Sequence, residues 1–350
     1  MTKEKSILIK NIYYMLSYAF TTLSNGGYED VAAEEFENIH NLFAAILAKG
    51  IGRQLKQGLY REYRDITDDM TVVRGKIDMQ GTIRNRLTRK RSLTCEYDEL
   101  SENNLLNRII KTTVMLLLRH DRVDQKHKND LKKEMLFFSN VDTVDPGSIR
   151  WQSIFFQRNN NTYLMLIGLC RLILEGMLQT TESGEYKLAN FIDSRHLERL
   201  YEKFVLEYYA KECPQIKASA SRIPWALDDG YGAMLPGMQS DITLSKGNDV
   251  LIIDAKFYTH TTNMYYNAHK IHSDNLYQIF TYVKNKDASF GNKAHKVSGM
   301  LLYAATDEEI QPDNSYMMSG NKISVRILDL NRDFSLISAQ LNAIVDEHFA

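Results

Sequence analysis

Cysteine, proline and long apolar runs are all scarce in this sequence. Its 350 residues include three cysteines and five prolines. The cysteines, Cys95, Cys170 and Cys213, lie far apart and show no CxxC or Cys/His spacing, so neither a disulfide framework nor a zinc site is indicated. No apolar run reaches the length of a bilayer span, and the opening residues lack a signal-peptide cleavage pattern. These absences predict a protein of the reducing cytoplasm that makes no membrane contact.

An excess of positive charge is also missing. The formal net charge at pH 7 is −1, whereas a free-standing DNA-binding protein usually carries a clear excess of Lys and Arg. Residues 1–195 contain 28 Lys and Arg against 25 Asp and Glu, and residues 196–350 contain 15 against 19. If the slightly acidic second part acts on DNA, another component must deliver the DNA. The sequence has no GxxxxGK[ST] loop, so we expect no nucleotide to be bound by this chain alone.

The length of the chain predicts two domains, because single hydrophobic cores rarely grow beyond about 250–300 residues. Apolar residues make up 44% and charged residues 25% of the sequence, which is typical of a soluble globular protein. Residues 1–194 combine helical patterns with strand-like stretches, whereas the order from residue 195 onward is helix, hairpin, helix, strand. We therefore expect an α/β protein, with an α+β domain over residues 1–194 and an α/β domain over residues 195–350.

Hydrophobic periodicity places the elements of both parts. In the first part, helical spacing predicts helices over residues 1–24, 36–58 and 105–119 and after the Asn-rich turn 159–161, and alternation predicts strands within 60–79. In the second part, the same patterns predict a helix over 195–212, strands over 238–245 and 249–258, a helix over 273–284 and a strand over 297–304. The turn at 246–248, Lys-Gly-Asn, joins the first two strands into a hairpin.

Three charged side chains interrupt this otherwise apolar hairpin. Asp241 lies within the first strand, and Asp254 and Lys256 lie two residues apart in the second, so the latter two project to the same face. Such charges are costly to bury unless they serve one another or a cation. The carboxylates of Asp241 and Asp254, with the carbonyl of Ala255 as a third oxygen, suit Mg²⁺ or Mn²⁺. Lys256 would then orient or help deprotonate a metal-bound water, and the metal would stabilise charge on an attacked phosphate.

An Asp-x-Lys triplet on one strand face also has a simpler interpretation, an exposed edge that carries a surface ion pair. Two features of the context favour the metal site. Apolar or small residues surround the charges and indicate a central strand, namely Leu251, Ile252, Ile253 and Ala255. A later helix carries Gln278 and Tyr282, which are four positions apart and therefore share a helix face.

The residues of this constellation follow a known order. Asp241, then Asp254-Ala-Lys256, then Gln278-Ile-Phe-Thr-Tyr282 resembles the PD-(D/E)XK nuclease pattern, including the QxxxY helix of its RecB-like branch. More widely, the chain resembles the McrC family, the nuclease subunits of modified-cytosine-dependent McrBC restriction systems. The segments that carry this resemblance run in order over nearly the whole chain: NIYYMLSYAF (Asn11–Phe20), VRGKID (Val73–Asp78), NRIIKTT (Asn107–Thr113), IIDAKFY (Ile252–Tyr258) and HSDNLYQIFTYV (His272–Val283). Ser240 stands where the pattern has proline, a position that varies in such nucleases.

The resemblance implies a complex of two kinds of subunit. McrC-like subunits associate with McrB, a GTP-hydrolysing AAA+ ring that recognises modified DNA; they supply the endonuclease and stimulate the GTPase. On this basis we expect residues 1–194 to dock the partner ring. Residues 195–350 would be the PD-(D/E)XK nuclease domain, which hydrolyses DNA phosphodiester bonds with Mg²⁺. The charge balance leads independently to the expectation that the partner delivers the DNA.

Polar side chains outside the hairpin are further candidates for the site. The resemblance implies that the helix before the hairpin can place another acid at the metal, and both Glu202 and Glu207 lie on that helix. For each of them a solvated helix surface is the alternative. We expect Gln278 to hydrogen-bond near the metal site or the DNA backbone. Tyr282 either does the same or is a half-buried core aromatic.

A basic stretch follows the strand-like region of the first part. Its five cations, with no acid between Met79 and Cys95, are Arg84, Arg86, Arg89, Lys90 and Arg91. Three interpretations stay open. The stretch is a solvated loop, or it contacts DNA phosphates, which follows from charge alone. The resemblance implies the third, insertion into the partner ring near its nucleotide, where arginines accelerate phosphoryl transfer.

Two other functions compete with the endonuclease. In the first, the chain is a non-catalytic adaptor of the AAA+ ring with a degenerate nuclease fold. Such an adaptor would not need the complete set of Asp, Asp-x-Lys and Gln. In the second, the chain is a free-standing RecB-like repair nuclease. That protein would have to cut DNA alone, which the slightly acidic second part disfavours.

Overall fold

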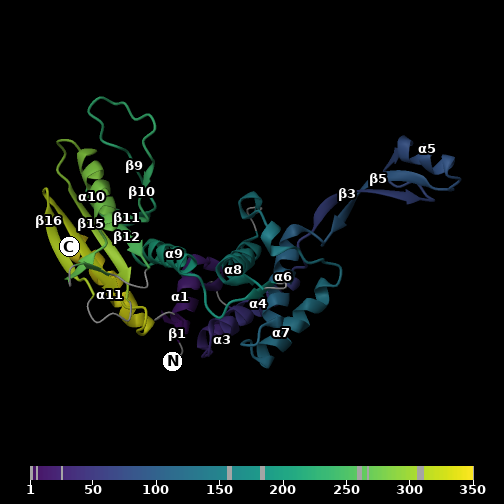
Figure 1. Ribbon diagram of the computed structural model, residues 1–350, viewed down its shortest axis with the longest axis horizontal. Coiled ribbons are helices and arrows are strands. Elements are labelled where there is room, and N and C mark those ends of the chain that lie inside the picture. The colour runs from purple at the N-terminus through teal and green to yellow at the C-terminus, as the bar shows by residue number, and fades with distance from the viewer. Residues whose placement is uncertain are drawn as a thin grey trace. The chain divides into compact units, whose positions relative to one another are not determined.

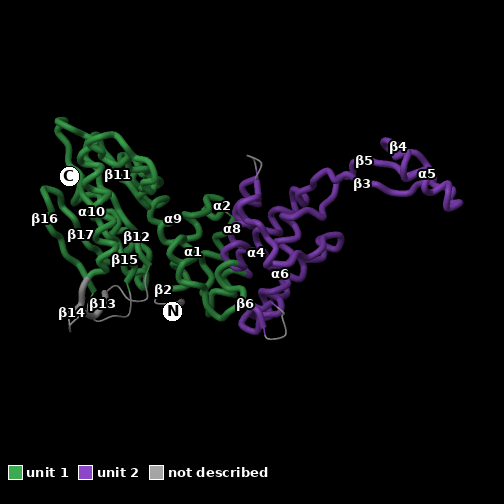
Figure 2. Tube along the Cα trace, turned by 45° about the horizontal axis from the view of Figure 1, so that its top comes forward, with its two compact units in different colours: residues 1–43, 175–179, 189–350 green, residues 44–174, 180–188 purple. Residues whose placement is uncertain are grey.

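The computed structural model describes residues 3–4, 7–24, 27–155, 160–181, 186–257, 262–265, 268–305 and 311–349 (Figure 1). The chain forms two compact units, each considered by itself (Figure 2). The sheet unit contains residues 1–43, 175–179 and 189–350, and the helical unit contains residues 44–174 and 180–188. Helices and sheets are mixed throughout, which confirms the expected α/β class. Over the described ranges, no helix is both long and apolar enough to cross a membrane.

Amphipathic helices form most of the helical unit. In α6, the buried residues Leu106, Ile109 and Ile110 recur at helical spacing. Asn104 caps this helix by accepting a hydrogen bond from the backbone N–H of Asn107. The helices are α4 (Ile39–Leu55) and α8 (Asn161–Met177), both shared with the sheet unit, α5 (Met79–Leu87), α6 (Leu105–Arg119) and α7 (Gln125–Met135), with short 3-10 turns η1 (Leu136–Phe138), η2 (Pro146–Ser148) and η3 (Trp151–Ser153). The strands are β3 (Glu62–Met70), β4 (Lys76–Asp78), β5 (Leu93–Ser101) and β7 (Tyr186–Leu188), and β7 pairs with β6 (Leu178–Thr180), whose first two residues belong to the sheet unit.

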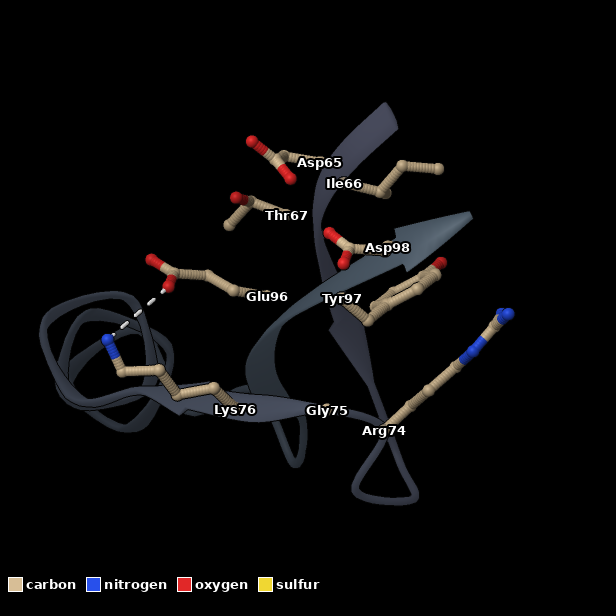
Figure 3. Close-up of a pocket in the computed structure, with 9 residues that line it drawn as sticks. All are labelled: Asp65, Ile66, Thr67, Arg74, Gly75, Lys76, Glu96, Tyr97 and Asp98. Carbon is tan, nitrogen blue, oxygen red and sulfur yellow. Dashed lines mark ion pairs between the residues drawn. The ribbon is translucent and has the colours of Figure 1, made fainter. Parts of the chain in front are cut away.

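Strands β3, β5 and β4 form an antiparallel sheet, on which α5 packs, and this sheet carries a hollow of about 810 Å³. Figure 3 shows Asp65 and Asp98 next to each other in this hollow, as the pairing of β3 with β5 requires. The guanidinium of Arg74 lies 4.1 Å from the centroid of the Tyr97 ring. Gly75 between the strands has a φ of +70°, and a Cβ there would lie 2.3 Å from a backbone oxygen of β5. The VRGKID segment is therefore a turn that leads into an edge strand.

A six-stranded mixed sheet organises the sheet unit, in the order β16-β17-β15-β12-β11-β8. Its strands are β8 (Lys217–Ser219), β11 (Ile242–Lys246), β12 (Asp249–Lys256), β15 (Lys296–Ala304), β16 (Asn314–Met318) and β17 (Asn321–Leu328). Strands β12, β15 and β17 are parallel, and the outer pairings are antiparallel. The remaining elements are α1 (Ile9–Ala19), α2 (Thr21–Ser24), α3 (Glu29–Ala33), α9 (Ser194–Glu212), α10 (Ser273–Ala288), α11 (Phe334–Phe349), and the pairs β1 (Lys3–Glu4) with β2 (Ile7–Leu8), β9 (Arg222–Ile223) with β10 (Met238–Gln239), and β13 (Thr262–Tyr265) with β14 (Ala268–Ile271).

Strand β12 is a central strand. It is flanked by β11 and β15 and contacted by both α9 and α10, and every residue after Asp249 in it is buried. Burial on two faces explains the nearly continuous apolar run of this strand. The interpretation of its Asp-x-Lys triplet as an exposed surface ion pair is therefore wrong.

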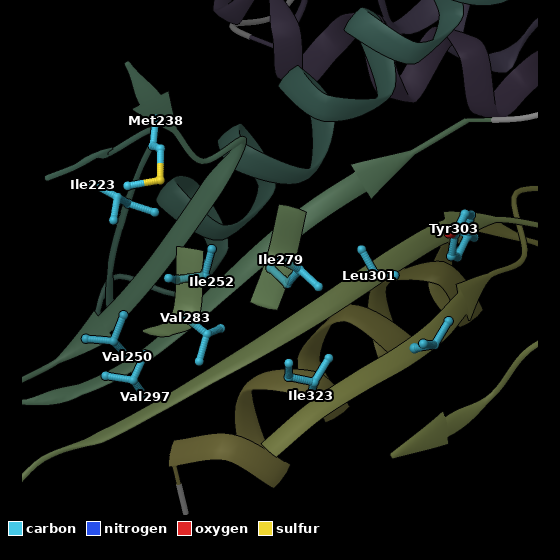
Figure 4. Packing of buried hydrophobic residues seen from close by; sticks show 11 residues of the cluster. Ile223, Met238, Val250, Ile252, Ile279, Val283, Val297, Leu301, Tyr303 and Ile323 are labelled. Carbon is cyan, nitrogen blue, oxygen red and sulfur yellow. The ribbon is translucent and has the colours of Figure 1, made fainter. Parts of the chain in front are cut away.

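Helix α10 packs directly on the sheet through a cluster of apolar side chains. Figure 4 shows Ile279 and Val283 of the helix over Ile252, Leu301 and Ile323 of three adjacent strands. The contact is close because β15 carries a glycine, Gly299, beneath the helix. A Cβ at Gly299 would lie 2.7 Å from Val283 Cγ2 and 2.8 Å from an atom of Ile279.

We therefore expect Gly299→Ala to lower the free energy of unfolding by about 1–3 kcal/mol, because an extra methyl group in a packed contact forces the helix or the strand to move. Gly237→Ala is the matched control, since nothing lies within 4 Å of a Cβ built there. Urea unfolding of the two variants and the wild-type chain measures the difference. Equal midpoints for both variants would mean that α10 does not rest on β15 as described.

The first 43 residues belong to the sheet unit. The side chain of Asn11 in α1 donates hydrogen bonds to the carbonyls of Leu330 at 2.8 Å and Arg332 at 2.7 Å. The Tyr14 ring stacks on Phe334 with a centroid distance of 4.3 Å. The compact units thus do not follow the expected boundary between residues 194 and 195. That the part before this boundary docks a partner and the part after it cuts DNA stays a prediction.

Most expected elements are present, with shifted ends. The helix expected over residues 1–24 begins only at Ile9, because β1 and β2 pair before it, and it divides at Phe20 into α1 and α2. The expected strand over 238–245 divides into β10 and β11 at Ser240 and Asp241, because the Ser240 N–H bonds to the carbonyl of Ser221 and the Asp241 carboxylate turns toward β12. Helix α10 runs on to Ala288, and β12 ends at Lys256, so Tyr258 of the expected strand lies outside the described residues.

Candidate active site

The site lies where β12 continues beyond its neighbour β11. Pairing between the two strands ends at Ile242 and Ile253, whereas β15 continues to pair with β12 up to Lys256. The last residues of β12 therefore have one backbone edge without a strand beside it. Asp241 fills the first position of this edge: its Oδ2 accepts a hydrogen bond from the N–H of Ala255 at 3.0 Å. This contact confirms that the hairpin brings Asp241 next to the Asp254-Ala-Lys256 triplet.

Asp254 and Lys256 form a buried ion pair. They project to the face of β12 that also carries Val250 and Ile252, as expected from alternation along a strand. The exposed fraction of Asp254 is 1% and that of Lys256 is 9%. Lys256 Nζ lies 3.1 Å from Asp254 Oδ2. Apart from this ion pair, neither carboxylate oxygen of Asp254 has a hydrogen-bond partner among the described residues.

The electrostatics of Asp254 reflect its burial. Desolvation raises the pKa of the Asp254 carboxyl to about 7; Lys256 opposes this rise, and the negative charge of Asp241 adds to it. A carboxylate that is removed from water and lacks hydrogen-bond donors is costly to ionise. A bound cation would therefore stabilise the ionised carboxylate of Asp254.

Helix α9 brings two further acids to the same place. Burial raises the pKa of Glu202 to about 7, with further rises from the nearby charges of Asp241 and Glu198. Burial also raises the pKa of Glu198, which Lys256 and a hydrogen bond from the backbone N–H of Phe257 oppose. Phe257 follows Ala255 by two residues, so Glu198 lies near the same strand edge as Asp241.

Of these acids, sequence reasoning found Glu202 and missed Glu198. The signal that was available is their spacing of four residues, which puts both on one face of α9. Glu207 lines a hollow of about 440 Å³ together with Glu202 and Asp241. Both glutamates chosen from the sequence thus line the same hollow. The negative charge of Asp254 also raises the pKa of Glu202.

Gln278 and Tyr282 of α10 contact each other. Gln278 Nε2 donates a hydrogen bond to the Tyr282 hydroxyl at 3.1 Å, and both side chains are partly buried. Tyr282 packs against the apolar cluster under α10. Within the described ranges neither side chain hydrogen-bonds to Asp241 or Asp254. The direct role expected for Gln278 at the metal or the DNA stays a prediction.

The basic stretch belongs to the helical unit. Its five cations lie at the C-terminal end of α5 and in the turn after it, and all are exposed: Arg84, Arg86, Arg89, Lys90 and Arg91. Lys90 Nζ lies 3.7 Å from Asp69 Oδ2. The exposure agrees with any of the three interpretations, so the role of this stretch stays a prediction.

The donors at the site fit Mg²⁺ or Mn²⁺. No group of three His, Cys, Asp or Glu side chains suited to a metal is present in the part of the chain that the structure describes. Asp241 and Asp254 supply two carboxylates, however, and a residue's N–H and C=O leave a strand on the same side, so the carbonyl of Ala255 points to the edge that Asp241 occupies. Mg²⁺ prefers oxygen donors and keeps several waters, so two carboxylates and one carbonyl are a sufficient set.

Known proteins resemble this chain over most of its length. One relative, the type IV methyl-directed restriction enzyme EcoKMcrBC of Escherichia coli (strain K12), is 25% identical over 350 residues, which are 99% of this chain and 99% of the relative. A half-complex from a tetradecameric assembly of Thermococcus gammatolerans McrB AAA+ hexamers with bound McrC contains a chain that is 19% identical, with a TM-score of 0.49 over 93% of this chain and 75% of that one. A second structure, of the McrBC complex of the same organism, gives 20% identity and a TM-score of 0.43 over 60% of each chain.

The family model described as the McrBC 5-methylcytosine restriction system component matches residues 3–304. This range includes α9, the hairpin of β11 and β12, and α10, and therefore every residue of the candidate site. The chain belongs to the family of McrBC 5-methylcytosine restriction system components.

Proposed function

We propose that this chain is the endonuclease subunit of its restriction system and cuts DNA by Mg²⁺-dependent hydrolysis of phosphodiester bonds. One observation carries the proposal: apart from its ion pair with Lys256, the buried Asp254 carboxylate has no hydrogen-bond partner among the described residues, and it lies next to the Asp241 position. A structural ion pair would be expected to satisfy such oxygens. A cation-binding carboxylate leaves them available.

Each side chain then has a distinct task. Asp241 and Asp254, with the Ala255 carbonyl, would hold the ion, and a bound Mg²⁺ would supply stabilisation of the charge on the attacked phosphate. Lys256, 3.1 Å from Asp254, is placed to orient the attacking water and, in its neutral amine form, to accept a proton from it. Glu198 adds a carboxyl group near the end of β12, where Lys256 lies. Glu202 adds a carboxylate that a proton neutralises when no cation is present.

We also propose that the chain works with an AAA+ ring that hydrolyses GTP and delivers modified DNA. Membership of the McrBC family and the likeness to a methyl-directed restriction enzyme of E. coli support DNA as the substrate and modification as the trigger. The formal net charge of −1 supports delivery by a partner, since the chain has no general excess of cations for DNA. The chain would stimulate the GTPase of the ring and act in the cytoplasm.

Reconstitution tests this function. The purified chain, its McrB-like AAA+ partner, GTP and a plasmid carrying 5-methylcytosine are expected to give cleavage with Mg²⁺ and none with EDTA. The same mixture without the chain should hydrolyse GTP more slowly and leave the plasmid intact. Cleavage that persists in EDTA, or that the partner performs alone, would contradict the proposal.

Among the described residues no third His, Cys, Asp or Glu completes a metal site, and this favours one other candidate, a non-catalytic adaptor that only regulates the ring. In the adaptor the carboxylates would be remnants, and the isolated chain would bind no metal. Titration calorimetry with Mn²⁺ separates the two. Heat that is present in the wild-type chain and lost in Asp254→Asn supports the endonuclease, and absence of heat in both supports the adaptor.

A further inference from the structure

We propose that Arg199 and Lys203 of α9 form a binding site for the DNA phosphodiester backbone beside the cleaved bond. This inference rests on the proposed endonuclease function and adds to it a substrate-binding site outside the catalytic set. Neither residue belongs to the sequence pattern that pointed to the nuclease. They are identified by their place in the fold, on the helix that also carries Glu198 and Glu202.

The two cations line the same hollow as an acid of the site. Arg199, Lys203 and Asp241 all contribute to its wall, and its volume is about 440 Å³. Four residues along a helix correspond to about 6 Å of rise, so the two cations follow one another on one face of α9. Both residues are exposed, although desolvation lowers the pKa of the Lys203 ammonium, which the charge of Glu207 opposes. If the cleaved phosphate of a DNA strand lay at Asp241, the neighbouring phosphates of that DNA strand would therefore lie close to Arg199 and Lys203.

The cationic groups are free to take an anion. Within the described ranges, the guanidinium of Arg199 makes no hydrogen bond and no ion pair. Lys203 Nζ lies 4.9 Å from the centroid of the Phe20 ring, a contact that holds the side chain in place and leaves the ammonium protons available. Gln239, which is exposed, lines the same wall and offers a side-chain amide as a further donor. Amides, hydroxyls and cations are the groups that proteins use for DNA phosphates.

The charge of the hollow makes this site depend on the metal. Its lining contains two cations, Arg199 and Lys203, and three carboxyl groups, Glu202, Glu207 and Asp241. The sum is 0 when Glu202 is protonated and −1 when it is ionised, and a divalent ion held by the carboxylates changes the latter sum to +1. A polyanion should therefore bind weakly to the metal-free chain and better to the chain with a divalent ion. This also explains how a chain without a general excess of cations can hold DNA locally.

The salt dependence of DNA binding by the full chain tests the inference. A short fluorescein-labelled duplex is titrated by fluorescence anisotropy over a series of KCl concentrations, with Ca²⁺ in place of Mg²⁺ to prevent cleavage. Each lost phosphate contact removes about 0.9 from the slope of log K against log salt. Arg199→Gln with Lys203→Gln should therefore flatten the slope by about 1.8 and weaken binding at low salt. Omission of Ca²⁺ should weaken binding of the wild-type chain.

Two further variants control for charge and folding. Lys211→Gln with Arg332→Gln removes two exposed cations of the same unit that lie outside the hollow, and it should leave the slope unchanged. Arg199→Lys with Lys203→Arg keeps both charges and should also keep the slope. An equal loss in the two Gln pairs would indicate general charge screening and overturn the inference. So would a wild-type chain that fails to bind the duplex at the lowest salt.

Cleavage is measured on the same preparations in the reconstituted system. A wild-type chain that never cleaves contradicts the proposed function, whatever the slopes are. A wild-type chain that cleaves, together with an unchanged slope in Arg199→Gln with Lys203→Gln, contradicts only the phosphate site. The two failures are thus distinguishable.

Discussion

Asp254→Asn is expected to reduce DNA cleavage about a thousandfold or more in the reconstituted system, and to leave stimulation of the partner GTPase intact. The amide keeps the volume of the carboxyl group and removes the negative charge that would hold the cation. Loss of several kcal/mol of charge stabilisation corresponds to a thousandfold when each tenfold is about 1.4 kcal/mol. The GTPase should survive, because the proposed role of Asp254 is confined to the nuclease site.

The variant should remain folded. Lys256 loses its ion pair with residue 254, but it still interacts electrostatically with two nearby acids, Glu198 and Glu202. Burial also favours the uncharged form of residue 254 in the absence of metal. Thermal unfolding of the metal-free proteins should therefore give similar midpoints for Asp254→Asn and the wild-type chain.

A matched control removes a carboxylate of the same unit outside the site. Asp313 is exposed and accepts a hydrogen bond from Arg326 at 2.9 Å. Asp313→Asn should cleave at the wild-type rate, because exposed ion pairs contribute little to stability and this one is absent from the site. Full cleavage by Asp254→Asn, or equal losses in both variants, would show that Asp254 does not belong to an active site.

The pairing of the charged residues could be predicted from the sequence because it depends on local geometry. Alternation along a strand places Asp254 and Lys256 on one face whatever the rest of the fold does. The short turn at 246–248 fixes the register of the hairpin, so Asp241 must lie near the far end of the second strand. The apolar run around the triplet already indicated a central strand. These steps need no tertiary information.

Glu198 could not be found this way, because its place depends on how α9 lies on the sheet. Side chains far apart in the sequence fix that position: the Tyr201 hydroxyl donates to the carbonyl of Leu302, and the Tyr201 ring lies 6.4 Å from that of Phe257. The helix pattern alone shows which residues point inward, but not which residue of β12 each one meets. The packing of residues 1–43 with the C-terminal sheet was hidden for the same reason, since Asn11 reaches carbonyls more than 300 positions away.

Metal affinity should depend steeply on pH. Burial and neighbouring acids raise the pKa of both Asp254 and Glu202 to about 7, so in the metal-free chain both carboxyls gain protons as the pH falls through 7. A cation competes with these protons, because it favours the ionised carboxylates. Two groups with a pKa of about 7 predict that the affinity for Mn²⁺ falls on the order of several hundredfold from pH 7.5 to 5.5. In Glu202→Gln only Asp254 still binds a proton in this range, so the affinity for Mn²⁺ should fall on the order of 25-fold over the same pH change.

The same shifts set the sign of the effect on stability. Because both pKa values are higher in the folded chain than the usual carboxyl values, the folded state binds more protons than the unfolded state between about pH 4 and 7. The contribution of these groups to the free energy of unfolding is therefore largest at low pH and is lost as the pH rises through 7. Saturating Mn²⁺ should reverse this trend, since the ion stabilises the charged site above pH 7.

Urea unfolding measures the effect as a difference. The free energy of unfolding of Asp254→Asn is subtracted from that of the wild-type chain at each pH, with and without Mn²⁺. A difference that does not change with pH, or one that rises with pH in the metal-free chain, would mean that the carboxyls are already ionised and that no cation is needed to keep them buried.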